Sequence, residues 1–246
     1  MQGIANIAVI FAGGVGSRMR SRDIPKQFLV IHGKPIIIHT LEHFERCENI
    51  DAIVIACVKE YIDKMRFLVE RYGITKVKDI VPGGATGQQS IYNGLVAAKK
   101  TATVDKAIVL IHDGVRPLIN EKVISENIES VKNYGSCITA GIVKETIVEI
   151  DDGGNILNVP ERKNSRVAKA PQSFYLNDIL SAHEKAISEN KFDFIDSCTM
   201  MKHYGHTLHM IDGPYENIKI TTPDDYYTMR AILDVRENNQ IYGDEE

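Results

Sequence analysis

Two basic side chains follow a glycine-rich stretch near the N-terminus. The apolar run Ile7–Phe11 leads into Ala12-Gly-Gly-Val-Gly-Ser17, and Arg18 and Lys26 come soon after. Glycines let a backbone approach a ligand closely, and free backbone N–H groups bind anions. The guanidinium and ammonium groups add positive charge at fixed spacing. We expect this stretch to bind the phosphates of a nucleoside triphosphate, although a tight strand-to-helix turn is the simpler structural alternative.

A carboxylate and a third basic segment could complete such a site. Asp113 lies in Ile111–Pro117, at the end of an apolar run, where it could help to hold Mg²⁺ on substrate phosphates. It could equally be a helix cap, and Arg116 could pair with it or border the site. Lys219 lies in Glu216–Asp225, where alternation of a β-type run would turn it away from its apolar neighbours. From the spacing alone, an ordinary solvated lysine is the better interpretation.

The elements that must position these residues alternate along the first half of the chain. Apolar runs predict strands, and amphipathic stretches predict helices between them. The strands are expected at 7–11, 52–58, 77–81 and 107–111, and the helices at 35–44, 61–72, 89–99 and 121–133. Because the strands are apolar on both faces, we predict an α/β fold: a Rossmann-like, mostly parallel sheet with helices on both faces. Such sheets bind ligands beyond the carboxyl ends of their strands.

The middle of the chain predicts a β-hairpin. Two β-type runs, Cys137–Val143 and Thr146–Ile150, precede the turn signal Asp151-Asp-Gly-Gly154, and 155–159 would be the returning strand. We expect a protruding arm at about 137–168 that forms a homodimer, the alternative being a hairpin that folds back on its own subunit. Helices at 176–188 and 197–204, a strand at 207–212 and a helix from 223 to about 235 should follow. We expect one domain, 1–246, with the arm embedded in it.

Composition limits the classes of partner. The net charge is −4 and charged residues make up 25% of the chain, so we expect neither nucleic acid nor a membrane as a partner. The four cysteines are far apart with no CxxC pair, which favours a reducing compartment over a disulfide framework or structural zinc. With no secretory leader and no apolar run of membrane length, we expect a cytoplasmic protein. The spacing of His203, His206 and His209 fits no standard metal site.

Taken in order, the motifs resemble one enzyme family over nearly the whole chain. AGGVGSRM, PKQF, the glycine pair before Ser90, HDGVRP and ENIKITTPDD are similar to those of the cytidylyltransferases of sugar-alcohol phosphates. This family includes the methylerythritol phosphate and ribitol 5-phosphate enzymes. The resemblance implies that an alcohol phosphate attacks the α-phosphate of CTP, releasing pyrophosphate and leaving a CDP-alcohol. Such chemistry depends on positioning and charge neutralisation rather than on a covalent intermediate.

The resemblance also implies a role for each matching residue. Arg18, Lys26 and Lys219 would stabilise charge at the α-phosphate, and Asp113 would bind Mg²⁺ or another divalent cation. Backbone amides from Gly13 to Ser17 would hold the triphosphate, and Gly84 with Ser90 would contact the cytidine. The expected nucleotide-binding residues are therefore Ala12, Gly13, Gly14, Gly16, Ser17, Gly84, Ser90 and Asp113.

The acceptor is a pentitol phosphate in our interpretation, with ribitol 5-phosphate favoured. The methylerythritol enzymes have a VRDT-like motif where this chain has Val143-Lys-Glu-Thr146, a cation without the guanidinium fork. Four segments are closer to the ribitol enzymes: 11–14, 159–162, 170–174 and 195–198. The expected acceptor-binding residues are Arg116, Lys144, Thr146 and Arg162. 2-C-methyl-D-erythritol 4-phosphate, an isoprenoid precursor, remains the alternative acceptor.

Two positions depart from the family pattern, and two other classes remain open. Gly87 stands where an arginine is usual, and Ile195 where a threonine is usual. A glycosyltransferase would need a DxD-type metal pair after a strand, which His112-Asp-Gly114 does not supply, and Asp224-Asp225 is better explained as charge at a helix start. A non-catalytic nucleotide-binding module would not require the whole set of cations.

Overall fold

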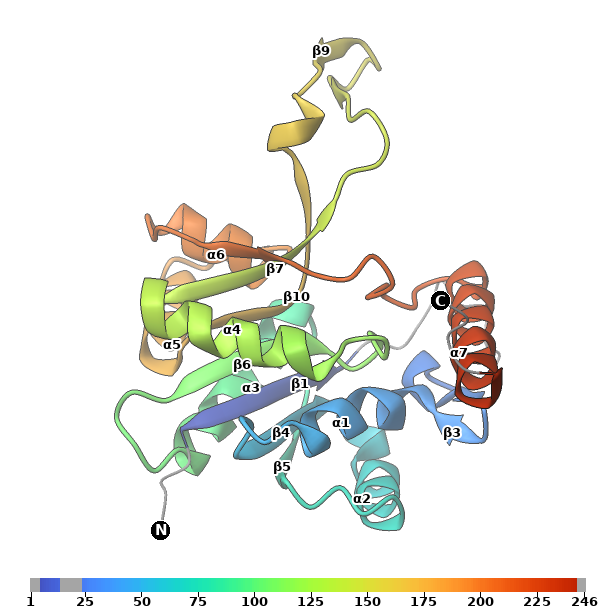
Figure 1. Ribbon diagram of the computed structural model, residues 1–246. Helices are drawn as coiled ribbons and strands as arrows, with labels where there is room; N and C mark the ends of the chain where they lie inside the picture. The colour runs from blue at the N-terminus through green and yellow to red at the C-terminus, as the bar shows by residue number, and fades with distance from the viewer. Residues whose placement is uncertain (1–4, 14–23, 243–246) are drawn as a thin grey trace.

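The computed structural model describes residues 5–13 and 24–242, with side chains to residue 238. In this part of the chain, a seven-stranded sheet has the order β11-β7-β10-β6-β1-β4-β5 (Figure 1). Its strands are β1 (Asn6–Ala12), β4 (Ala52–Cys57), β5 (Val77–Pro82), β6 (Ile108–Asp113), β7 (Ser136–Ile142), β10 (Arg166–Tyr175) and β11 (Met210–Asp212). β1, β4, β5 and β6 run parallel, which confirms the predicted mostly parallel sheet.

One strand was not predicted from the sequence. β10 pairs antiparallel with both of its neighbours, β6 and β7. Its first half is exposed and its second half, Ala170 to Phe174, is buried, so it lacks the continuous apolar run of the other central strands. Backbone hydrogen bonds to two neighbours, rather than side-chain pattern, make this segment a strand.

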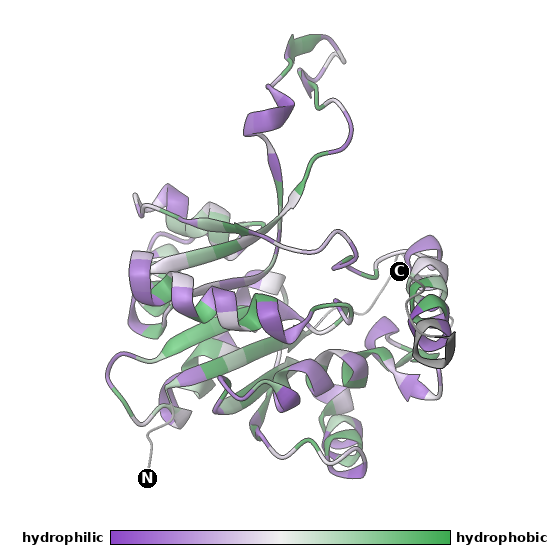
Figure 2. Ribbon diagram, viewed as in Figure 1, coloured by the Kyte–Doolittle hydropathy of each residue, from purple (hydrophilic) through white to green (hydrophobic). Residues whose placement is uncertain are grey.

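Helices cover both faces of the sheet, as expected. α1 (Ile36–Arg46), α2 (Ile62–Arg71) and α4 (Glu121–Tyr134) pack on one face, and α3 (Gly87–Thr101), α5 (Leu176–Ser188) and α6 (Ser197–His203) pack on the other. Alternation along β1 supplies both cores, because Ala8 and Ile10 face the first set while Ile7 and Val9 face the second. Figure 2 accordingly shows apolar strands at the centre and polar outer surfaces on the helices.

Local sequence signals define the ends of the longer helices. Thr86 caps α3 by accepting a hydrogen bond from the Gln89 N–H at 3.1 Å, and Asn120 caps α4 through the Val123 N–H at 2.9 Å. Gly135 ends α4 with φ of +80°, a conformation that favours glycine. These caps fix where the loops leave the helices.

The predicted hairpin is an arm that extends away from the sheet, at the top of Figure 1. Beyond β7, the short strands β8 (Glu149–Ile150) and β9 (Ile156–Asn158) pair antiparallel, and the 3-10 turn η4 (Arg162–Asn164) leads back into β10. Asp151 holds the tip by accepting hydrogen bonds from the Gly153 and Asn155 N–H groups. The alternative, a hairpin folded back over its own subunit, is not what the structure shows.

The C-terminal region differs from the prediction in two ways. The stretch 217–222, expected to be a β-type run, is irregular and is tied to the body by a 2.9 Å hydrogen bond from the Ile220 N–H to the Val115 carbonyl. No sheet edge of the described structure pairs with it. The last helix, α7 (Pro223–Tyr242), is also longer than predicted. Its Met229 joins a buried cluster with Ile220, which precedes the helix, and with Ile31 of the small hairpin of β2 (Val30–Ile31) and β3 (Lys34–Pro35). No described helix combines the length and apolar character needed to cross a membrane.

Candidate active site

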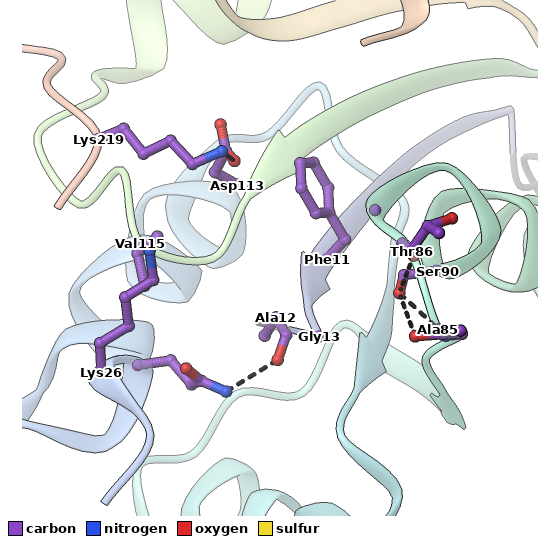
Figure 3. Close-up of a pocket in the computed structure, with 13 residues that line it drawn as sticks. Phe11, Ala12, Gly13, Lys26, Ala85, Thr86, Ser90, Asp113, Val115 and Lys219 are labelled. Atoms are coloured by element: carbon purple, nitrogen blue, oxygen red, sulfur yellow. Dashed lines mark hydrogen bonds and ion pairs between the residues drawn. The ribbon is translucent and has the colours of Figure 1, made fainter. Parts of the chain in front are cut away.

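A cavity of about 320 Å³ lies at the carboxyl ends of the parallel strands (Figure 3). β1 ends in Ala12 and β6 in Asp113, and the loop after β5 supplies the opposite wall. Its lining residues are Phe11, Ala12, Gly13, Lys26, Gln27, Gly84, Ala85, Thr86, Gly87, Ser90, Asp113, Val115 and Lys219. The fold thus joins the glycine-rich stretch with segments that lie 70 to 200 residues further along the chain.

The sequence-predicted nucleotide and catalytic residues divide into two groups. Seven of them line this cavity: Ala12, Gly13, Lys26, Gly84, Ser90, Asp113 and Lys219. The other four, Gly14, Gly16, Ser17 and Arg18, lie outside the described residues. The two described residues of the glycine-rich stretch, Ala12 and Gly13, therefore both line the cavity.

The loop after β5 is built around the hydroxyl of Ser90. This hydroxyl accepts a hydrogen bond from the Gly84 N–H at 2.9 Å and donates one to the Thr86 carbonyl at 2.9 Å. A side chain at Gly13 would collide with it, because a Cβ there would lie 2.7 Å from the Ser90 Oγ. The lack of a Cβ at Gly13 thus allows β1 and the α3 loop to approach each other, which a larger residue would prevent.

Lys26 is held at the cavity by its neighbours in the 3-10 turn η2 (Lys26–Phe28). The buried Gln27 donates from Nε2 to the carbonyl of Ala12 at 2.8 Å, which ties this turn to the end of β1. Phe28 is buried and stacks on Tyr61, with ring centroids 5.2 Å apart. These two contacts leave Lys26 little freedom of backbone position, so its ammonium group enters the cavity from a fixed point.

Asp113 forms the charged centre of the site. Its Oδ2 lies 2.7 Å from the Arg116 Nε, and its Oδ1 lies 2.6 Å from the Lys219 Nζ. Figure 3 shows Lys219 extending toward this carboxylate from the irregular segment before α7. Arg116 also donates to the Asn217 carbonyl at 3.0 Å, so it joins the β6 turn to the segment that carries Lys219. Lys219 is therefore oriented by a network and is not an ordinary solvated lysine.

The charge state of this network follows from its surroundings. Burial alone would raise the pKa of Asp113, but the charges and hydrogen bonds of Arg116 and Lys219 outweigh it and lower the pKa to about 2. Asp113 is thus a carboxylate at neutral pH. Burial lowers the pKa of the adjacent His112 to about 4, so this ring is neutral and donates from Nε2 to the Arg116 carbonyl at 3.1 Å. His112 supports the turn and does not carry charge.

A second cavity of about 270 Å³ adjoins the first. The two share Phe11, Gly87, Asp113 and Lys219. Arg116 lines the second cavity, as does Ile195, whose side chain is almost fully exposed at its rim. The two positions that depart from the family pattern, Gly87 and Ile195, therefore both border these cavities.

The other predicted acceptor residues lie on the arm and line neither cavity of this chain. Lys144 places its ammonium group 3.5 Å from the ring centroid of Tyr215. Arg162 donates to the Lys144 carbonyl at 3.1 Å, which closes the base of the arm, and Thr146 is exposed on the arm. Within one subunit, the structure brings together the nucleotide residues but not these acceptor residues.

A divalent cation would have one carboxylate in this site. No group of three or more His, Cys, Asp or Glu side chains suited to a metal occurs among the described residues. Mg²⁺ is often held by one or two carboxylates with substrate phosphates and waters completing its shell. The ionised Asp113 at the cavity wall fits that requirement, provided that the ion shares the carboxylate with Lys219 and Arg116.

Sequence reasoning missed three residues that shape these cavities. Gln27 lies in the PKQF motif, but its bond to Ala12 could not be inferred from spacing. Thr86, three residues before Gln89, has the spacing of a capping box and could have located the start of α3. Lys169 lines the second cavity, and nothing in the sequence pattern distinguishes it from a surface lysine.

The arrangement can bind a polyphosphate and stabilise negative charge. Lys26 and Lys219 reach one cavity from separate segments, next to backbone N–H groups and an ionised carboxylate. In a partly enclosed site such groups stabilise developing charge more strongly than in water. Because none of the described cavity residues is paired with a general base as an activated nucleophile would be, the geometry favours direct transfer between two phosphates.

Comparisons with known proteins agree with this chemistry. The family model for IspD, 2-C-methyl-D-erythritol 4-phosphate cytidylyltransferase, matches residues 6–235. A ribitol-5-phosphate cytidylyltransferase of Streptococcus agalactiae is 58% identical over 97% of this chain and 99% of its own length. One of Vibrio parahaemolyticus is 50% identical over 97% of this chain and all of its own. A 2-C-methyl-D-erythritol 4-phosphate cytidylyltransferase of Clostridium botulinum is 39% identical over 93% of this chain and 97% of its own.

A solved structure shares the fold. The 4-diphosphocytidyl-2C-methyl-D-erythritol synthase of Anaerococcus prevotii superposes with a TM-score of 0.82 and 28% identity, covering 94% of this chain and 96% of that one. The chain belongs to the IspD family of cytidylyltransferases, and it is a nucleotidyltransferase. This confirms the family, the fold and the enzyme class predicted from the motifs.

Proposed function

We propose, from the membership of this chain in the IspD family, that it transfers the cytidylyl group of CTP to ribitol 5-phosphate, giving CDP-ribitol and pyrophosphate. The observation that carries the proposal is the cavity into which Lys26 and Lys219 reach beside the ionised Asp113. Ribitol 5-phosphate is favoured as acceptor because the relatives named for it are more similar to this chain than those named for methylerythritol phosphate.

The reaction is a substitution at the α-phosphorus of CTP. An oxygen of the acceptor phosphate forms a bond to that phosphorus, while the bond to the bridging oxygen breaks and pyrophosphate leaves with the electron pair. Both reacting groups are anionic, so the main obstacles are repulsion and alignment. Lys26 and Lys219, together with Arg18, would offset the charge that accumulates at the α-phosphate. Asp113 would keep Lys219 aligned through their ion pair.

The remaining site residues would bind and orient the nucleotide. The backbone N–H groups from Gly13 to Ser17 would hold the triphosphate, and Gly84 with Ser90 would border the cytidine. The carbonyl of Ala12 accepts a hydrogen bond from Gln27, and this bond holds Lys26, the residue before Gln27, in position. Asp113 would be the protein ligand of Mg²⁺ or another divalent cation, which when bound would neutralise phosphate charge.

The arm would complete the acceptor site in a homodimer. Its exposed apolar side chains are Ile142, Ile147, Val148, Ile150, Ile156, Leu157, Val159 and Val167. So many apolar residues on one projecting hairpin favour contact with a second copy of the chain. The partner's arm would then bring Lys144, Thr146 and Arg162 to the acceptor.

We further propose that the chain forms one nucleotidyltransferase domain and acts in the cytoplasm on soluble substrates.

A substrate panel tests the proposal. The purified protein would be incubated with each of the four nucleoside triphosphates, Mg²⁺, and either ribitol 5-phosphate, 2-C-methyl-D-erythritol 4-phosphate or a sugar 1-phosphate. Pyrophosphate release and the nucleotide product are measured, and CTP with ribitol 5-phosphate should give the highest kcat/KM. A higher value with methylerythritol phosphate would overturn the acceptor, and turnover with no CTP pair would overturn the activity. Light scattering that gives a monomer mass at micromolar concentration would overturn the dimer.

A further inference from the structure

Lys169 is built into the wall of the second cavity. It lies on β10, and its Nζ donates to the carbonyls of Pro214 at 3.3 Å and Tyr215 at 3.0 Å. An ammonium group has three N–H donors, so these bonds leave one for a ligand in the cavity that Lys169 lines. The side chain is half-buried, and burial followed by the nearby Arg116 charge lowers its pKa. It is therefore a partly desolvated cation with a fixed position.

The neighbouring strand leaves room for this side chain. Gly141 on β7 faces it, and a Cβ there would lie 2.8 Å from the Lys169 Cε. Any larger residue at this position would displace the end of the lysine. The absence of a side chain at Gly141 thus preserves the position of the ammonium group at the cavity.

Ser197 supplies a second polar group that lacks a partner. It is 3% exposed and lines the second cavity, yet its Oγ has no hydrogen-bond partner among the described residues. Its position is fixed by a network beside it, in which Gln172 donates to Asp196 at 3.0 Å and accepts from the Cys198 N–H at 2.8 Å. A buried hydroxyl without a hydrogen-bond partner destabilises the protein. A hydrogen bond from a bound ligand to the Ser197 Oγ would remove this cost, which explains an unpartnered hydroxyl in the wall of the cavity.

The residues that the two cavities share indicate where the phosphate and the polyol chain of an acceptor bind. Asp113 and Lys219 belong to both cavities, so the reacting phosphate of the acceptor must lie at this boundary, next to the α-phosphate of CTP. The rest of the acceptor then extends into the part of the second cavity that the nucleotide cavity does not share. Lys169 and Ser197 lie in that part, where a polyol chain presents hydroxyl groups.

We propose that Lys169 and Ser197 are specificity-determining residues that hydrogen-bond the hydroxyl groups of the polyol phosphate. The inference rests on the proposed function and deepens it. The Lys169 ammonium donates to one hydroxyl, and the Ser197 Oγ exchanges a hydrogen bond with another. Neither residue takes part in the transfer of the cytidylyl group, so their contribution is to the binding of the acceptor and not of CTP.

Steady-state kinetics on the full-length protein test this role. Ribitol 5-phosphate is varied at saturating CTP and Mg²⁺, and CTP is varied at saturating acceptor. Lys169→Met should raise the KM for ribitol 5-phosphate by about tenfold or more, the range for a lost hydrogen bond to a charged group. The KM for CTP should stay within about twofold of wild type, because Lys169 does not line the nucleotide cavity. Lys169→Arg, which keeps the charge, should have an acceptor KM closer to wild type than Lys169→Met has.

Two further variants separate substrate binding from a structural role. Ser197→Ala should raise the acceptor KM by about threefold to tenfold, as expected for one neutral hydrogen bond. It should leave the melting temperature of the free protein unchanged or higher, because it removes a buried group without a partner. Lys185→Met is the matched control. The Lys169 Nζ lies 5.6 Å from the ring centroid of Tyr215, and the Lys185 Nζ lies 4.8 Å from that of Tyr204, but Lys185 lines neither cavity. Its kinetics should equal those of wild type.

The outcomes distinguish this inference from the function on which it rests. If wild-type protein makes no CDP-ribitol, the proposed function is wrong and this inference falls with it. If wild type is active and Lys169→Met leaves the acceptor KM within twofold, only this inference is wrong. An equal rise in the KM for CTP would also overturn it, because that result would mean that Lys169 only supports the loop that carries Lys219.

Discussion

Replacing Asp113 by asparagine should destabilise the protein and disorganise the catalytic lysine. The change keeps the shape of the side chain but removes the charge that faces Arg116 at 2.7 Å and Lys219 at 2.6 Å. The carboxylate is almost fully buried, so water does little to screen these contacts. Asp113→Asn should therefore lose folding stability and most of its turnover.

The pKa of Asp113 gives the magnitude of the loss. Folding lowers this pKa from 3.8 to about 2, and one pKa unit corresponds to about 1.4 kcal/mol. The ionised carboxylate thus contributes on the order of 2 to 3 kcal/mol to stability at pH 7. Because the folded-state pKa is the lower one, this contribution is complete above about pH 4 and is lost as the pH falls toward 2. At pH 3 about half of it should remain.

Urea unfolding at pH 7 and pH 3, followed by circular dichroism, measures this effect. The free-energy difference between wild type and Asp113→Asn should be about 2 to 3 kcal/mol at pH 7 and about half as large at pH 3. Asp63→Asn is the matched control, because Asp63 also pairs with an arginine but its side chain is 97% exposed. Its stability should match wild type at both pH values. If Asp113→Asn is as stable as wild type at pH 7, the buried carboxylate does not stabilise the fold. If the difference in unfolding free energy between the two proteins does not shrink at pH 3, its ionisation is not the cause of the stabilisation.

Other contacts give predictions of the same kind. Gln27→Leu should lower kcat by about tenfold or more without unfolding the protein, because the bond to the Ala12 carbonyl that positions Lys26 is lost; an unchanged kcat would contradict this. The hydrogen bond to Glu237 raises the pKa of His32 more than its partial burial lowers it, so this contact stabilises the docking of α7 at acidic pH. This stabilising contribution of His32 is complete below about pH 6.5 and is lost as the pH rises through the raised pKa of the histidine. The melting temperature of wild type relative to His32→Gln should therefore fall between pH 6 and pH 8, and a constant difference would contradict it. Chelation of divalent cations should abolish pyrophosphate release, and added Mg²⁺ should restore it; full activity in excess chelator would exclude the metal role of Asp113.

Much of the fold was predictable because its signals are local. The continuous apolar runs of β1, β4 and β6 can only be buried on both faces, which requires a parallel sheet between helices. The hairpin turn at Asp151 is likewise a property of a few adjacent residues. β10 was missed because its pairing depends on β6 and β7, which lie far from it in the sequence. The segment around Lys219 was wrongly expected to be extended in a strand, because no partner strand lies beside it.

The sequence by itself determined the class of chemistry. The glycine-rich stretch, the basic residues Lys26 and Lys219 and the carboxylate Asp113 occur in an order that resembles the cytidylyltransferases, and the comparisons bear that out. The residue types are sufficient to predict this chemistry, because a phosphate-binding site needs cations and a close approach of the backbone in any fold.

Only the tertiary structure decided how these groups act together. Lys219 is 106 residues from Asp113 in the chain, and its ion pair exists because Arg116 joins the β6 turn to the segment before α7. The structure likewise places Lys169 and Ser197 in one cavity, which adjoins the cavity that Ala12 and Gly13 line. Such contacts depend on how distant segments pack, and spacing along the sequence does not encode the distances between them.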